Sequence, residues 1–87
     1  MSDFNDFIDL VYTTRDKELL TDFLIAVTTL KERKEFAQRV DIVKLLVAGT
    51  PQLQIAKQLG VGTATVTRGS KELAQGRFKV LREVKGA

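Results

Sequence analysis

Residues 51–71 read PQLQIAKQLGVGTATVTRGSK, and this stretch indicates the fold more strongly than any other part of the chain. Thr50-Pro51 favours the start of a short helix, because proline tolerates the first turn and the threonine can cap it from just outside. Gly60 should end that helix at Leu59, and Thr63 can cap a second helix that runs to about Leu73. The stretch therefore predicts two short helices joined by a tight turn.

Such a pair forms a helix-turn-helix when three requirements are met. It needs a small residue where the helices cross, a residue able to adopt positive φ in the turn, and buried aliphatic residues beside both. Ala56, Gly60 and Val66 meet these requirements. Further apolar contacts would come from Ile55, Leu59 and Val61, so that the polar and small residues of both helices can face outward.

Basic residues are concentrated in the second part of the chain. Residues 1–36 carry five basic and eight acidic side chains, whereas residues 37–87 carry nine basic and three acidic ones. No acidic residue lies between Lys44 and Lys71. An acid-free surface can approach a polyanion without repulsion, as phosphate contacts with DNA require, although an ordinary solvated face would carry the same charges.

We therefore expect the outward residues to bind double-stranded DNA. The narrow edge that begins at Thr63 can enter the major groove, where threonine methyl groups and alanine can meet thymine methyl groups. The alternative from another class is a helical protein-interaction module whose basic half binds an acidic partner. The expected DNA-binding residues are Gln52, Leu53, Gln54, Lys57, Thr63, Ala64, Thr67, Arg68 and Lys71, of which Lys57, Arg68 and Lys71 would reach phosphates.

The composition leaves little room for catalysis or metal binding. The 87 residues include no cysteine and no histidine, which excludes disulfides, thiolate metal sites and Ser-His or Cys-His nucleophile pairs. The scattered carboxylates show no pairing typical of an acid–base site. No apolar run approaches a membrane span and the first residues do not resemble a signal peptide, so we expect a cytoplasmic protein that is not an enzyme, has no cofactor and binds no membrane.

Apolar residues at helical spacing predict further helices on both sides of the motif. Thr29 and Glu32 have the spacing of a capping box, which would start the helix before the motif, and Gly49 should close that helix. We expect an all-α fold of six helices. The apolar stripes cover residues 4–11, 19–27 and 36–46 before the motif, and a last helix is expected within residues 75–85.

We interpret residues 1–87 as a single domain with three parts. Residues 1–49 would form a dimerisation core, residues 50–73 the helix-turn-helix reading head, and residues 75–85 a helix that completes the core. The amino-terminal stripes are more apolar than one monomer of this size can comfortably cover. They should therefore interlock between the two subunits of a homodimer.

The strings GVGTATVTRGS at residues 60–70 and RVDIVKLLVAG at residues 39–49 closely resemble the tryptophan operon repressor family. The resemblance runs from about Thr28 to Leu73, whereas the amino-terminal helices match in pattern more than in residues. It implies six helices in an intertwined homodimer, with L-tryptophan as the corepressor. It also implies an operator of tryptophan biosynthesis as the DNA target.

The resemblance further implies that L-tryptophan lies between the core and the reading head. Arg39 and Arg68 would sandwich the indole ring, which agrees with the tendency of guanidinium planes to stack on aromatic faces. Without the resemblance, Arg39 would be interpreted as a solvated side chain and Arg68 as a phosphate contact. Gly69 would leave room for the ring, and the remaining ligand-binding residues would be Thr29, Thr65 and Glu72.

Several residues depart from the family pattern, and three of them bear on the ligand and the DNA. Glu72 stands where the family has a serine that contacts the ammonium group of the ligand. Its carboxylate could accept that ammonium more strongly, or it could pair with Arg68 and block the ligand. Leu53 and Ala56 stand where the family has an arginine that reads guanine and a lysine. Glu72 keeps open a second interpretation, a regulator of the same fold that responds to another small molecule or to none.

Overall fold

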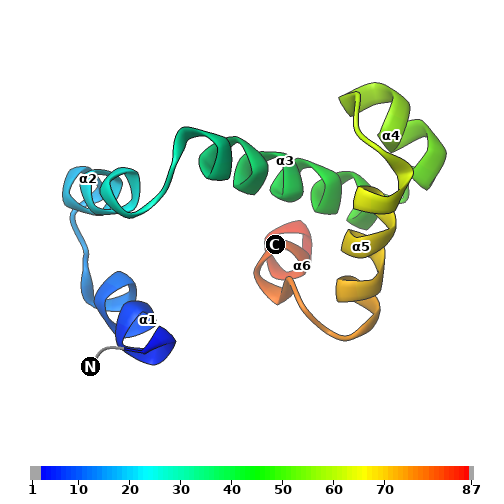
Figure 1. The fold of residues 1–87 in the computed structure, drawn as a ribbon. Coiled ribbons are helices and arrows are strands. Elements are labelled where there is room, and N and C mark those ends of the chain that lie inside the picture. Colours follow the sequence, from blue (N-terminus) through cyan, green and yellow to red (C-terminus); the bar gives the residue numbers. More distant parts are fainter. Residues whose placement is uncertain (1–2, 87) are drawn as a thin grey trace. The chain divides into compact units, whose positions relative to one another are not determined.

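The computed structural model describes residues 3–86, with side chains as far as residue 82, and these residues form six helices and no strand. The predicted all-α class is therefore confirmed. The chain divides into an amino-terminal unit, Met1–Arg33, and a carboxyl-terminal unit, Lys34–Ala87. Along the chain the helices are α1 (Phe4–Thr13), α2 (Lys17–Val27), α3 (Leu30–Val47), α4 (Gln52–Leu59), α5 (Thr63–Ala74) and α6 (Lys79–Gly86) (Figure 1).

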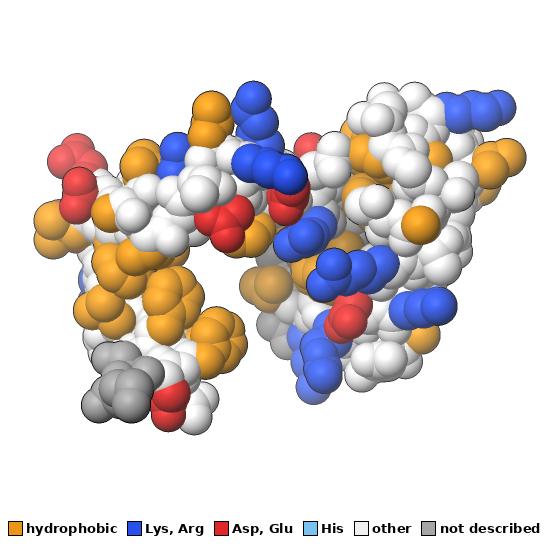
Figure 2. Space-filling view, viewed as in Figure 1, with side chains coloured by type: hydrophobic (Ala, Val, Ile, Leu, Met, Phe, Trp, Pro, Cys, Tyr) orange, Lys and Arg blue, Asp and Glu red, His pale blue; other side chains and the backbone are white. Residues whose placement is uncertain are grey.

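The first two helices bury none of their own residues. The half-buried ring of Phe7 packs against the rings of Phe4 and Phe23, with centroid separations of 5.9 and 5.7 Å. Many other apolar side chains of this unit are open to solvent, as the orange side chains in Figure 2 show. Leu19 is 64% exposed and Tyr12 is 85% exposed. Exposed apolar surface of this kind favours association with a partner.

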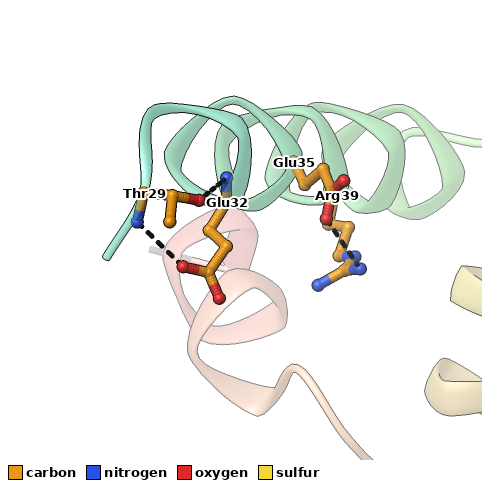
Figure 3. Close-up of polar contacts among 4 residues, drawn as sticks. All are labelled: Thr29, Glu32, Glu35 and Arg39. Atoms are coloured by element: carbon orange, nitrogen blue, oxygen red, sulfur yellow. Dashed lines mark hydrogen bonds and ion pairs between the residues drawn. The ribbon is translucent and has the colours of Figure 1, made fainter. Parts of the chain in front are cut away.

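Polar contacts define the turn between α2 and α3. The predicted capping box is confirmed, because Glu32 N–H donates to Thr29 Oγ1 at 3.1 Å and Thr29 N–H donates to Glu32 Oε1 at 2.8 Å (Figure 3). The hydrogen bonds from Thr29 lower the pKa of the Glu32 carboxyl group. Arg33 Nη1 donates to the carbonyl groups of Ile25 and Thr28 at 3.0 and 2.9 Å, which ties the end of α2 to the start of α3.

The buried core of the described residues lies in the carboxyl-terminal unit. Ile42 and Val43 of α3 are buried together with three residues of the predicted helix-turn-helix, Ile55, Ala56 and Val66. Leu59 and Val61 are partly buried against them, as are Leu45 and Leu46 of α3. The inward orientation predicted for Ile55, Leu59, Val61 and Val66 is therefore confirmed.

Two glycines allow this packing. Gly60 has a φ of 66°, the left-handed conformation predicted for the turn, and its N–H donates to the carbonyl group of Ala56. A Cβ atom at Gly69 would lie 3.3 Å from Ile42 Cγ2 and 3.4 Å from Leu46 Cδ1. Glycine at this position therefore lets α5 approach α3 closely. Figure 1 shows α4 and α5 meeting at an angle beside the carboxyl-terminal end of α3.

The two predicted caps of the motif are wrong. Pro51 rather than Thr50 occupies the N-cap of α4, and Gly62 rather than Thr63 occupies the N-cap of α5, with no side-chain cap at either position. The reason is that Thr63 already belongs to the first turn of α5, so its side chain lies past the capping position. The first turn of α4 begins instead with the N–H of Ile55 donating to the carbonyl group of Pro51 at 3.0 Å.

None of the described helices is both long enough and apolar enough to cross a membrane.

Candidate nucleic-acid interface and small-molecule cavity

The outward side of the helix pair α4–α5 is open to a partner. The predicted groove-reading residues Thr63 and Ala64 are exposed at the start of α5, and Thr67 is half-buried. The other predicted DNA-binding residues are all exposed, and they are Gln52, Leu53, Gln54, Lys57, Arg68 and Lys71.

A hydrogen bond joins the two helices on this side. The Thr67 hydroxyl group donates to Gln52 Oε1 at 3.0 Å. The bond fixes Gln52 at the start of α4 relative to the middle of α5. The polar side chains of both helices are therefore presented as one surface, although nothing in the sequence spacing had paired these two residues.

The charge of the carboxyl-terminal unit suits a polyanionic partner. Figure 2 shows basic side chains gathered over this unit with few acidic side chains among them. The acid-free stretch from Lys44 to Lys71 includes all of α4 and most of α5. A phosphate backbone can therefore approach the exposed Lys57 and the start of α5 without meeting a carboxylate from this stretch, and Glu72 follows only after Lys71.

A cavity of about 640 Å³ lies beside the interface, in the size range of about 300–1,000 Å³ that is typical of small-molecule sites. Five of the six predicted ligand-binding residues line it, and four of these come from one helix, α5. Ile42 and Val43 of α3 supply apolar surface. The predicted residues brought together are Arg39 from α3 and Thr65, Arg68, Gly69 and Glu72 from α5.

Charged groups of both signs meet at the cavity. The guanidinium group of Arg39 lies 3.7 Å from a carboxylate oxygen of Glu35, one turn earlier on α3 (Figure 3). Glu72 Oε2 lies 3.6 Å from Nε of Arg77, whereas Arg68 forms no ion pair with any residue that the structure describes. The pairing of Glu72 with Arg68 that would block a ligand is therefore absent from this part of the chain.

Thr29, the sixth predicted ligand-binding residue, lies in the amino-terminal unit. Its hydroxyl oxygen accepts the N–H of Glu32 as the cap of α3. A role of Thr29 in ligand binding stays a prediction.

Arg77 and Phe78 line the cavity but were missed at the level of sequence. Both residues follow the break in the helical pattern at Gln75-Gly76. Helical spacing therefore does not predict which way their side chains point. Gly76 has a φ of 86° and ends α5 in a left-handed turn, and Phe78 also has a positive φ, of 59°. The signal that could have found Arg77 is Gly76 itself, because a glycine that ends a helix in this way brings the next residue back beside the last helical turn.

The exposed helix pair, the packed turn and the acid-poor surface define a helix-turn-helix DNA-binding domain. Comparison with known proteins agrees, because a sequence model of the Trp repressor protein family matches residues 2–83. The chain therefore belongs to the Trp repressor protein family. It is a DNA-binding transcriptional repressor and not an enzyme.

Similar proteins include three Trp operon repressor homologs. The protein from Vibrio vulnificus (strain YJ016) is 40% identical over 73 residues, which cover 83% of this chain and 72% of the relative. The protein from Vibrio cholerae serotype O1 is 41% identical over 73 residues, which cover 83% and 71%. A more distant relative from Chlamydia caviae is 37% identical over 71 residues, which cover 80% and 70%.

Proposed function

We propose that this repressor is a homodimer whose corepressor is L-tryptophan and whose target is an operator of tryptophan biosynthesis. The observation that carries the proposal is the cavity in which Arg39 of α3 and Arg68 of α5 meet apolar Ile42 and Val43. Guanidinium groups stack on aromatic rings and pair with carboxylates, and the apolar residues suit an indole ring. The names of the relatives support the operator.

The exposed apolar residues of α1 and α2 support the homodimer. A second copy would cover side chains such as Leu19 and Tyr12, which are largely exposed in the single chain. Helix-turn-helix dimers, among which Trp repressors are a standard example, bind half-sites about 34 Å apart on DNA. Two reading heads on one dimer would enter successive major grooves.

The ligand would act by binding one orientation of the reading head better than others. Because the cavity takes its lining from both α3 and α5, a bound tryptophan would restrict the angle between these helices. Linkage then requires that operator DNA tightens tryptophan binding by the same factor by which tryptophan tightens DNA binding. Calorimetric titration of tryptophan with and without operator DNA measures the first factor, and equal affinities in the two titrations would refute the coupling.

Three alanine variants test the assignment of roles. Arg39→Ala should raise the Kd for L-tryptophan at least about tenfold, because it removes a charge-assisted contact, and should leave ligand-free DNA binding unchanged. Lys57→Ala should weaken DNA binding and leave the Kd for L-tryptophan unchanged. It should also reduce the slope of the logarithm of the DNA-binding constant against the logarithm of the salt concentration by about one. Arg68→Ala should weaken both the binding of L-tryptophan and the binding of DNA.

A wild-type protein that binds DNA but releases no heat with L-tryptophan would contradict the proposal.

A second candidate is a regulator of the same fold with a different effector, and Glu72 at the cavity favours it. If the carboxylate excludes tryptophan, Glu72→Ser should produce a large gain in tryptophan affinity in the same calorimetric titration. Under the first proposal the substitution should weaken tryptophan binding or leave it unchanged.

A further inference from the structure

The ion pair between Glu72 and Arg77 is built into the way α5 ends. The N–H of Arg77 donates to the carbonyl group of Glu72 at 2.9 Å, and the N–H of Gly76 donates to that of Leu73 at 3.0 Å. With Gly76 at positive φ, these two bonds form the common glycine-terminated helix end, which sets residues 72 and 77 side by side. An apolar contact usually joins these two positions. In this chain an ion pair takes its place.

Glu72 has a second cation within reach. Arg68 lies four residues earlier on α5, the spacing at which oppositely charged side chains on a helix can pair. In the structure Glu72 instead pairs with Arg77, although Arg68 and Glu72 both line the cavity. The backbone turn that presents Arg77 therefore decides which arginine neutralises Glu72.

The ion pair leaves Glu72 able to accept another cation. Its Oε2 lies 3.6 Å from Arg77 Nε, beyond normal hydrogen-bond length, and its Oε1 has no hydrogen-bond partner among the described residues. The side chain of Glu72 is 38% exposed and that of Arg77 is 68% exposed, so Arg77 holds the carboxylate from the solvent side. A charge-assisted hydrogen bond in this partly shielded position is stronger than one in water.

We propose that Arg77 is a positioning residue of the cavity. By holding Glu72, it keeps Glu72 from pairing with Arg68, so that Arg68 can bind the carboxylate of a ligand, and it keeps Glu72 at the lining as an acceptor for a ligand ammonium group. The cavity therefore selects a zwitterionic amino acid over the same molecule without its amino group. This inference rests on the proposed function, because it takes the cavity to be the effector site.

The experiment compares L-tryptophan with indole-3-propionate, which has hydrogen in place of the amino group, by calorimetric titration of the full chain. The wild-type protein should bind L-tryptophan about tenfold more tightly than the analogue, as expected for one charge-assisted hydrogen bond. Glu72→Gln should remove this preference by raising the Kd for L-tryptophan, while the Kd for indole-3-propionate stays the same or falls.

Arg77→Gln provides the test of positioning. Without Arg77, Glu72 pairs with Arg68, and both ligands should bind about three- to tenfold more weakly because each carries a carboxylate. The double variant with Glu72→Gln and Arg77→Gln should bind indole-3-propionate as tightly as Glu72→Gln alone. Such non-additive effects would show that Arg77→Gln acts through Glu72. Lys79→Gln is the matched control, because it removes another exposed positive charge two residues away and should change neither affinity.

The outcomes separate this inference from the proposed function. Equal wild-type affinities for the two ligands would overturn the inference and leave the tryptophan site intact. The inference would also be overturned, with the tryptophan site left intact, if Arg77→Gln changed the affinity for neither ligand, as is expected of Lys79→Gln. A wild-type protein that binds neither ligand would refute the proposed function and, with it, the inference.

Discussion

Gly60 and Gly62 are separated by one residue in the turn between α4 and α5, yet they meet different requirements. Gly60 has a φ of 66°, which L side chains rarely adopt, whereas Gly62 has a φ of −71°, which any residue adopts. A Cβ atom would meet no heavy atom within 4 Å at either position. Backbone conformation, and not space, therefore makes Gly60 the glycine on which the turn depends.

Gly60→Ala should accordingly lower the free energy of unfolding by about 1–2 kcal/mol, the cost of a left-handed alanine. Gly62→Ala is the matched control and should leave it unchanged or raise it by about 0.4–1 kcal/mol, because the unfolded chain loses freedom. Urea denaturation of both variants measures the difference. Equal losses of stability would show that the turn is not strained at Gly60.

Glu32 makes the stability of the chain depend on pH. The hydrogen bonds from Thr29 lower its pKa in the folded state, so folding favours the ionised carboxylate. This contribution is complete above the pKa of the unfolded chain and is lost as the pH falls through the lowered value. Thermal unfolding at decreasing pH should therefore show a smaller loss of stability for Glu32→Gln than for the wild type, and parallel profiles would contradict this.

The helix α4 shows how one element serves both the core and the interface. Ile55 is fully buried against α3 and α5, whereas Leu53, two residues earlier, is 63% exposed on the outward side. The family resemblance places Leu53 where an arginine reads DNA. Buried core residues and exposed residues of the predicted interface therefore share the eight residues of one helix.

Substitutions on these two faces should have separate effects. Ile55→Ala should lower the free energy of unfolding by about 2–5 kcal/mol, because it leaves a cavity in the core. Leu53→Ala should change it by no more than about 0.5 kcal/mol, since an exposed side chain loses little packing. Chemical denaturation checks both values. A large loss of stability for Leu53→Ala would assign Leu53 to the core and remove it from the predicted interface.

In the whole molecule, the two units differ in how much apolar surface they cover. The carboxyl-terminal unit has a buried core around Ile42, Ile55 and Val66, whereas α1 and α2 bury none of their residues. A chain of 87 residues has little stability to spare, so association would supply what the amino-terminal unit lacks. Folding and dimerisation should consequently be coupled.

This coupling predicts a thermal midpoint that rises with protein concentration. Leu19→Lys should raise the dimer dissociation constant at least about tenfold, because it places a charge in the apolar surface to be covered. Thr21→Lys adds the same charge at an exposed polar position of α2 and is the control. Equilibrium sedimentation measures both, and a wild-type monomer at micromolar concentration would refute the homodimer.

Much of the fold could be predicted from neighbouring residues. The capping box of Thr29 and Glu32, the turn at Gly60 and the inward aliphatic residues all depend on helical periodicity and on backbone preferences, which act over a few residues. Five ligand-binding residues inferred by resemblance lie around one cavity. The capping predictions for Thr50 and Thr63 failed because a shift of one residue moves a side chain from the cap into the helix.

Contacts between distant residues could not be predicted in the same way. The placement of Arg39 around the same cavity as α5 depends on how closely α3 and α5 approach, which the lack of a side chain at Gly69 beside Ile42 permits. The choice of Arg77 over Arg68 as the partner of Glu72 depends on the turn at Gly76. Local chemistry therefore specifies the helices, whereas packing between them specifies the cavity, because side-chain distances across helices are set by crossing geometry and not by spacing along the chain.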